Sequence, residues 1–508
     1  MFAKILIIAI FFAITISIGL YCRRHATNVN DFVLAGRNVG PWMSAFAYGT
    51  TYFSAVVFVG YAGQFGWGFG TSVVWIGIGN ALIGSLLAWV VLGRRTRVMT
   101  KHLDSATMPD FFAKRYNSAV LKIVVSALIF VFLVPYSASV YKGLSQLFAM
   151  AFGLDVIYCI IGMAILTGLY VVLGGYMAVA INDLVQGVVM IGGIIGIIAV
   201  VLHDQGGLMS AMTEMSKIES PAAPGYQGVF TSFFGPDPMT LIGIVILTSL
   251  GTWGLPQMIH KFYTIKDEKA IQTGTIISTV FALIISGGSY FNGSFGRLYY
   301  TPAADGTVAF DDIIPTMVGK VMPDVMIGLI LVMVLSASMS TLSSLVMASS
   351  STFTLDFLRG TLFPHMGKKT QIAVIKLLCV LFVVLSVVIA INPNNLITTL
   401  MSLSWGALAG SFLGPFLYGL FWKRTTKAAV WASMIFAVCF NTINLFEGWF
   451  APPVAGAIAM VASLAIVPLV SIFTPRVDAA TVDYAFSYYN EKIQVTVERK
   501  SRLPEAGK

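Results

Sequence analysis

Long apolar runs follow one another along the whole chain, separated by short polar or glycine-rich segments. Hydrophobic residues make up 57% of the sequence and charged residues only 10%, whereas a soluble domain is about a quarter charged. An apolar run of about 17 to 25 residues matches the hydrocarbon core of a bilayer, which is about 30 Å thick. The sequence therefore predicts an all-α integral membrane protein with about 13 transmembrane helices, at residues 3–21, 42–63, 71–93, 121–149, 155–173, 177–202, 239–259, 272–296, 322–350, 370–391, 394–420, 428–447 and 451–473.

Lysine and arginine residues gather in every second loop. They follow the predicted helix 71–93, at Arg94, Arg95 and Arg97, and the predicted helix 239–259, at Lys261. Because basic residues are retained on the cytoplasmic side of a membrane, we expect the N-terminus outside and the C-terminal tail inside a cell membrane, inner or plasma. This asymmetry accounts for the net charge of +9, so a nucleic-acid partner is not expected and the lipid bilayer is.

A polar, glycine-led segment interrupts the second apolar run at residues 48–54, with the sequence YGTTYFS. Inside hydrocarbon, each unsatisfied backbone N–H or C=O costs several kcal/mol. A broken transmembrane helix is therefore tolerated only where it is buried in protein or lines a watery cavity. The break predicts a binding site for an ion or a solute.

A second interruption lies at residues 249–257, where the sequence SLGTWGLPQ places two glycines and a proline in an apolar run. A simple proline kink is the alternative explanation. The two breaks are five predicted helices apart, which is typical of transporters built from two inverted five-helix repeats. The expected organisation is a peripheral first helix and loop at 1–30, a first repeat at 31–205, an extracellular loop at 206–238, a second repeat at 239–425, two peripheral helices at 426–475 and a cytoplasmic tail at 476–508.

Hydroxyl side chains cluster in the predicted helix 322–350, in the sequence SASMSTLSS at residues 336–344. Hydroxyls in membrane helices often bond to a carbonyl of their own helix or to a neighbouring helix, and this reading stays open. Sodium, however, is a hard cation that prefers oxygen ligands. Ser340 and Thr341, together with carbonyls freed at the 48–54 break, would form an oxygen cage for Na⁺ that needs no carboxylate.

Two charged side chains fall within the apolar runs. Asp183 lies near the start of the predicted helix 177–202, where it is either a helix-start residue favoured by the dipole or closes a second cation site with Ser343 and Ser344. Lys142, in the predicted helix 121–149, either extends to the outer interface or lines an outer vestibule that attracts anions.

Several short motifs resemble those of the sodium:solute symporter family, which includes proline, pantothenate, sialic acid and sugar symporters with the leucine-transporter fold. The resemblance covers roughly residues 30–425 and is carried by GR at 36–37, GGYMAV at 174–179, ND at 182–183, QG at 186–187, MSTLS at 339–343 and FWKR at 421–424. It implies a sodium site built from the carbonyls of Thr50, Phe53 and Ala337 and the hydroxyls of Ser340 and Thr341. Some members bind a second sodium with residues that match Asp183, Ser343 and Ser344.

The same resemblance indicates the solute. Tyr136 matches a substrate-contacting tyrosine of the proline symporters, whereas Tyr52 stands where those proteins carry an acidic residue. Val57 and Ile76 replace the polar residues of sugar symporters, which disfavours a sugar. Aromatic side chains supply flat apolar walls with polar tips, and the expected substrate residues are Thr51, Tyr52, Ser54, Tyr136, Trp253 and Gln257. A small solute with one carboxylate fits best, such as an amino acid like proline, a monocarboxylate or pantothenate.

These observations predict a Na⁺-coupled secondary active symporter that imports a small organic solute by alternating access. A proton-coupled transporter in which Lys142 or Asp183 titrates, and a Na⁺ symporter for sialic acid or a sugar, are the alternatives. An ion channel is disfavoured because the sequence holds no recognisable filter segment. An enzyme is not expected, because the five histidines fall in predicted loops or at span ends and form no catalytic constellation, namely His25, His102, His203, His260 and His365.

Overall fold

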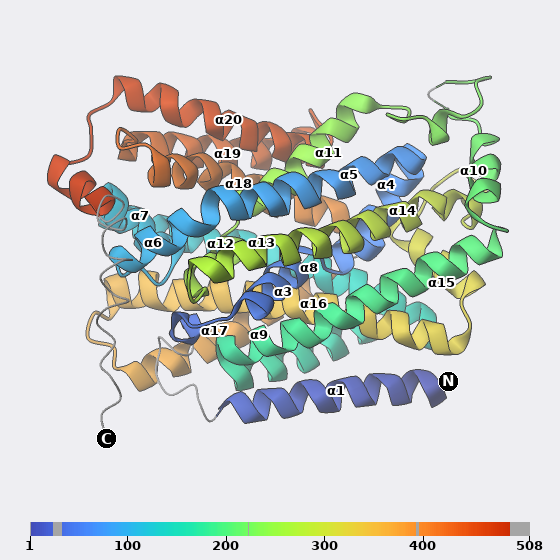
Figure 1. Ribbon diagram of the computed structural model, residues 1–508, viewed down its shortest axis with the longest axis horizontal. Coiled ribbons are helices and arrows are strands. Elements are labelled where there is room, and N and C mark those ends of the chain that lie inside the picture. Colours follow the sequence, from blue (N-terminus) through green and yellow to red (C-terminus); the bar gives the residue numbers. More distant parts are fainter. Residues whose placement is uncertain (1, 24–32, 222, 393–395, 488–508) are drawn as a thin grey trace.

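The computed structural model describes residues 2–23, 33–221, 223–392 and 396–487, and in these ranges every regular element is a helix. The helices lie side by side in one bundle, with many of their axes running in a similar direction (Figure 1). The longer helices are α1 (Phe2–Arg23), α8 (Ala119–Phe152), α9 (Val156–Asp204), α13 (Glu268–Ala282), α16 (Asp324–Thr352), α17 (Lys368–Ala390), α18 (Ile397–Phe421), α19 (Lys427–Glu447) and α20 (Pro452–Phe473). The predicted all-α membrane class is confirmed.

Shorter helices make up the interrupted spans and the connections between spans. They are α3 (Pro41–Tyr52), α4 (Ala62–Phe69), α5 (Val74–Gly79), α6 (Arg94–His102), α7 (Met108–Tyr116), α10 (Leu208–Ser216), α11 (Pro238–Leu250), α12 (Pro256–Thr264), α14 (Gly288–Ser294) and α15 (Ile313–Val321). They are continued by the π-helical segments η2 (Val56–Tyr61), η4 (Asn80–Leu87) and η5 (Trp89–Gly93). Two short 3₁₀ helices, η7 (Gly251–Trp253) and η10 (Phe310–Asp312), do the same.

Ten helical stretches in the described residues are long and apolar enough to cross a membrane, or eleven if the bent pair around η7 counts as one. The sequence predicted about 13. One cause is that helix continues without interruption from Val56 to His102, across parts of the predicted spans 42–63 and 71–93, while α3 is too short to span a bilayer alone. In the described residues each predicted span nevertheless falls largely on helix.

The predicted spans 155–173 and 177–202 form a single run of helical backbone, α9. The lengths of the apolar runs predicted two separate spans there. Glycine costs only about 1 kcal/mol relative to alanine in a helix interior, however, and no proline lies in the junction. Helical hydrogen bonding therefore continues through a junction that the hydropathy pattern divides.

Helices α16 and α18 form the centre of the bundle and are almost wholly buried. Both are rich in serine, alanine and glycine, and such small residues allow neighbouring helices to approach closely. Helices α8, α9 and α3 pack on α16, while α19 and α20 pack on α18. Helix α1 lies at one side of the bundle and α20 at the opposite side (Figure 1).

The first predicted break is confirmed, although it is narrower than the sequence suggested. Helix α3 continues through Tyr52, and only residues 53–54 leave the helical conformation before η2 resumes. Phe53 is extended, with φ −112° and ψ 113°, and its N–H still donates to the Gly49 carbonyl at 3.2 Å. The break therefore exposes carbonyls at the end of α3 without unwinding the whole polar segment.

The second predicted break is confirmed as well. Helix α11 tightens into η7, Leu255 adopts an extended conformation, and Pro256 begins α12 at a bend of 41°. Helix α12 then continues to Thr264, five residues beyond the predicted end of this span. That extension corrects one assignment, because Lys261 lies buried and His260 half-buried within the helix and not in a cytoplasmic loop.

Candidate sodium and solute sites

The end of α3 meets the hydroxyl cluster of α16 in the buried interior. The Ser340 hydroxyl donates to the hydroxyl oxygen of Thr50 at 2.8 Å. The Thr341 hydroxyl lies 3.3 Å from the Thr50 carbonyl, 3.2 Å from the Thr51 carbonyl and 3.1 Å from the Ala337 carbonyl. All these residues are 0 or 1% exposed. The structure thus collects hydroxyl and carbonyl oxygens where the first helix breaks.

This cluster contains four of the five residues that the family resemblance implied for sodium, namely Thr50, Ala337, Ser340 and Thr341. Phe53, the fifth, lies buried at the break with its ring stacked 4.2 Å from that of Tyr52. The Thr51 carbonyl joins the cluster although the sequence did not predict it. Neutral oxygens of this kind suit a hard monovalent cation, so the residues present fit Na⁺.

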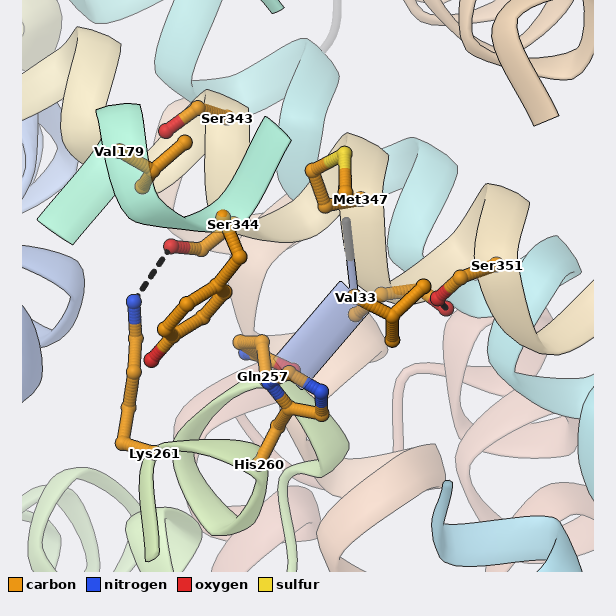
Figure 2. Close-up of a pocket in the computed structure, with 11 residues that line it drawn as sticks. Val33, Val179, Gln257, His260, Lys261, Ser343, Ser344, Met347 and Ser351 are labelled. Carbon is orange, nitrogen blue, oxygen red and sulfur yellow. Dashed lines mark hydrogen bonds between the residues drawn. The ribbon is translucent and has the colours of Figure 1, made fainter. Parts of the chain in front are cut away.

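A buried ion pair lies beside this cluster. The Asp183 carboxylate on α9 is fully buried, and its Oδ2 atom lies 3.5 Å from the Lys261 Nζ on α12. Lys261 also donates to the Ser344 hydroxyl at 2.9 Å, as Figure 2 shows. The Ser344 hydroxyl in turn shares a hydrogen bond of 3.0 Å with the Thr51 hydroxyl. Asp183 and Ser344, predicted for a second sodium, are brought together around a lysine ammonium.

The third residue predicted for the second sodium points elsewhere. The Ser343 hydroxyl donates to the Ser340 carbonyl of its own helix at 2.9 Å. This is the local back-bonding that serine commonly adopts in membrane helices. Ser343 lines the small cavity near Lys261, but the hydrogen bond of its hydroxyl is directed along α16.

An aromatic cluster lies on the other side of the break. The Tyr52 hydroxyl donates to the Thr248 carbonyl at 2.6 Å, and its ring stacks on that of Trp405 with centroids 6.2 Å apart. The Tyr136 ring meets Trp405 edge to face at 5.9 Å, and its hydroxyl lies beside Ser54. The structure therefore brings together three predicted substrate residues, Tyr52, Ser54 and Tyr136.

Trp405, on α18, is the member of this cluster that the sequence did not indicate. Its side chain is 1% exposed, and its indole N–H makes no well-aligned hydrogen bond within the described part of the chain. A Cβ added at Gly251 would collide with the Trp405 ring, so only glycine allows η7 to approach it. A tryptophan within an apolar helix has no periodic signature, which is why only the folded structure shows this role.

Two predicted substrate residues lie apart from the aromatic cluster in their contacts. The half-buried Trp253 donates its indole N–H to the Ile83 carbonyl at 3.0 Å. Gln257 lines a cavity of about 10 Å³ together with Lys261 and Ser344 (Figure 2), and such a volume suits about one water molecule. Thr51, another predicted substrate residue, lies between the oxygen cluster and this small cavity. Its carbonyl belongs to the oxygen cluster, and its hydroxyl contacts Ser344 at the cavity.

Charged groups line both ends of the bundle. At one end, Lys142 faces Asp311 and Asp312 of η10. Burial raises the pKa of Asp311 to about 6, while the positive charge of Lys142 acts in the opposite direction. At the other end, Lys122 lies 2.7 Å from Asp110 and 3.3 Å from the buried Asp356.

This second charged group borders a large open cavity of about 870 Å³. Its wall includes the basic side chains Arg37, Lys114, Arg359 and Lys368. The Thr107 hydroxyl donates to Asp356 at 2.6 Å, so the buried carboxylate there is held from two sides.

Two interrupted helices in corresponding positions are typical of the inverted-repeat class of secondary transporters. The model of one family within this class, the sodium:solute symporter family, matches residues 32–436. The chain belongs to that family. It is a multi-pass membrane protein and a Na⁺-coupled solute symporter, and not an enzyme.

The relatives and structural neighbours agree with this assignment. A sodium/proline symporter of Staphylococcus aureus is 30% identical over 444 residues, covering 85% of this chain and 83% of the relative. The osmoregulated proline transporter OpuE of Bacillus subtilis is 28% identical over 441 residues, covering 85% of this chain and 86% of the relative. A Na⁺-coupled sialic acid symporter in a substrate-bound outward-open state superposes with a TM-score of 0.75 at 17% identity, covering 94% of this chain and 99% of that one. The last likeness concerns the fold.

Proposed function

We propose that this symporter imports a small amino acid or monocarboxylate of about the size of proline, driven by Na⁺ bound where α3 ends against α16. The observation that carries the ion site is the oxygen cluster around Thr341, whose hydroxyl lies within 3.3 Å of three carbonyls from two different helices. The relatives named as proline transporters support the solute class.

The coupling follows from the position of the oxygen cluster. Sodium held by α3 and α16 oxygens would fix the broken end of α3 against the centre of the bundle. The side chains of Tyr52 and Ser54, at the same break, form part of the proposed solute site. An ion that orders this segment therefore favours solute binding, and the solute favours ion binding by the same factor. Coupling of about 1–3 kcal/mol corresponds to roughly 5- to 150-fold in affinity.

The solute site is assigned to the aromatic cluster. Tyr52, Tyr136 and Trp405 provide flat walls that suit a small apolar ring or chain. The indole N–H of Trp405 is a buried donor that makes no well-aligned hydrogen bond in the described residues, although the Tyr136 hydroxyl lies beside it. A buried donor of this kind is costly unless something accepts its hydrogen bond. A solute carboxylate would accept it. A bulky polyhydroxylated solute has few polar partners in this cluster.

We extend the proposal to topology. The N-terminus lies outside and the tail inside, which puts the 870 Å³ cavity with Arg37 and Lys368 on the cytoplasmic side. The repeats span residues 31–205 and 239–425, with α1, α19 and α20 outside them. This arrangement makes the large cavity the exit route for solute.

The test is uptake of radioactive proline, other small amino acids and monocarboxylates into proteoliposomes under an inward Na⁺ gradient. Accumulation of one of these solutes that stops when Na⁺ is replaced by K⁺ supports the proposal. Accumulation that ignores Na⁺ and follows a pH gradient would favour the proton-coupled alternative.

A pair of tryptophan variants then tests the solute site. Trp405→Phe removes the buried indole N–H but keeps an aromatic wall, and a hydrogen bond to a charged group is worth about 1.5–3 kcal/mol. The KM for solute is expected to rise about tenfold or more. Trp253→Phe is the matched control, because its N–H is already bonded to Ile83, and its KM should stay close to that of the wild type.

A further inference from the structure

The second cation position implied by the family resemblance lies where Lys261 extends from α12 toward α16 (Figure 2). We infer that the Lys261 ammonium permanently takes the place of a second sodium ion, so that this symporter binds one Na⁺ per solute. The inference rests on the proposed function and adds its ion stoichiometry.

The contacts of Lys261 are those expected of a bound cation. Its Nζ atom lies 2.9 Å from the Ser344 hydroxyl oxygen and 3.5 Å from the Asp183 carboxylate. The third neighbour is the face of the Tyr176 ring, 5.2 Å from the ammonium to the ring centroid, a typical cation–π arrangement. Three oxygen or π-electron donors from α9 and α16 thus surround one positive charge.

Charge balance argues against a further ion at the same place. Asp183 and Lys261 are 0 and 1% exposed, and an uncompensated charge buried this deeply is strongly unfavourable. One carboxylate balances one cation. Sodium entering beside Lys261 would meet a second positive charge at close range, and among the described residues Asp183 is the one acidic side chain that contacts Lys261. The hydrogen-bond partners within the described oxygen cluster around Thr341 are hydroxyls and carbonyls, with no cationic side chain among them.

The lysine also connects the two broken helices. Lys261 lies on α12, which begins at Pro256 directly after the second break. Its ammonium donates a hydrogen bond to the Ser344 hydroxyl, which in turn is hydrogen-bonded to the Thr51 hydroxyl at the end of α3. The tethered ammonium therefore holds α12, α16 and α3 together by contacts that a mobile second ion would otherwise supply. Only the site at Thr341 then depends on external sodium.

The experiment counts sodium ions bound to the purified full-length protein in detergent, by equilibrium dialysis with radioactive sodium. The wild type is expected to bind one Na⁺. Lys261→Met vacates the space beside Asp183 and Ser344 and is expected to bind two. Lys217→Met removes an exposed lysine that pairs with Glu214 and serves as the control, with one ion expected.

A double variant serves as a second test in case Lys261→Met alone fails to fold. Lys261→Met with Asp183→Asn removes both charges, so no buried carboxylate is left unpaired, and it should bind one Na⁺. Two ions on the wild type would overturn the inference, and that result needs no variant. One ion on both the wild type and Lys261→Met would also overturn it, because the lysine would then not occupy a latent sodium site. No sodium on the wild type would instead refute the proposed function itself.

Discussion

Replacing Thr341 by valine isolates the sodium site, because valine has almost the same shape and lacks only the hydroxyl. In the structure that hydroxyl lies 3.1 to 3.3 Å from three carbonyl oxygens and is fully buried. An interaction of this kind with a charged group is worth about 1.5–3 kcal/mol. At about 1.4 kcal/mol per factor of ten, the Na⁺ concentration for half-maximal uptake should rise roughly ten- to a hundredfold.

The effect on folding should be much smaller. The carbonyls of Thr50, Thr51 and Ala337 lose one weak hydrogen bond in exchange for a methyl group, which costs about 1 kcal/mol. Expression and the melting temperature without Na⁺ should therefore change little, and Na⁺ activation should change greatly.

The assay is solute uptake in proteoliposomes over a series of external Na⁺ concentrations at constant ionic strength. Thr341→Ser keeps the hydroxyl and is the matched control, with a half-saturation concentration expected near that of the wild type. If Thr341→Val responded to Na⁺ as the wild type does, the hydroxyl would not be a sodium ligand and the reasoning from this cluster would fail.

Three further changes test the packing and the charges. Gly251→Ala pushes a methyl group into the indole ring packed against it, so uptake should fall severalfold with a lower melting temperature. Lys122→Met leaves the buried Asp356 uncompensated and should cost about 3 kcal/mol in melting experiments, whereas the exposed Lys217→Met should cost less than about 1 kcal/mol. Folded Asp311 has a pKa of about 6, raised from 3.8, so its contribution to the free energy of unfolding falls by up to about 3 kcal/mol as pH rises through that interval. Asp311→Asn should remove this slope in melting curves between pH 4 and 7.

The helices and their two interruptions follow from local physics. Apolar runs of spanning length must form helices in a bilayer, and Gly251, Gly254 and Pro256 weaken or remove the hydrogen bonds of any helix that contains them. The cluster of Ser340 and Thr341 was also predictable, because two hydroxyls in an apolar helix require partners. The exact extent of the first break was not, since Tyr52 remains helical through contacts with distant segments.

Other features depend on tertiary contacts that a sequence pattern does not encode. Lys261 seemed to be one of the basic loop residues that set orientation, yet α12 continues past it and buries it against Asp183. Trp405 belongs to an apolar helix and becomes part of the candidate site only because α18 packs beside η7 and Tyr52. In both cases the partner is more than 70 residues away in the chain, so neither periodicity nor composition indicates it.

Solute-driven movement of sodium tests the coupling most directly. Proteoliposomes with equal Na⁺ inside and outside receive an inward gradient of the solute identified by uptake, and entry of radioactive sodium is followed. We predict net Na⁺ accumulation in step with solute for the wild type and a large loss of both for Thr341→Val at the same Na⁺ concentration. Solute entry without any accompanying sodium would contradict the account.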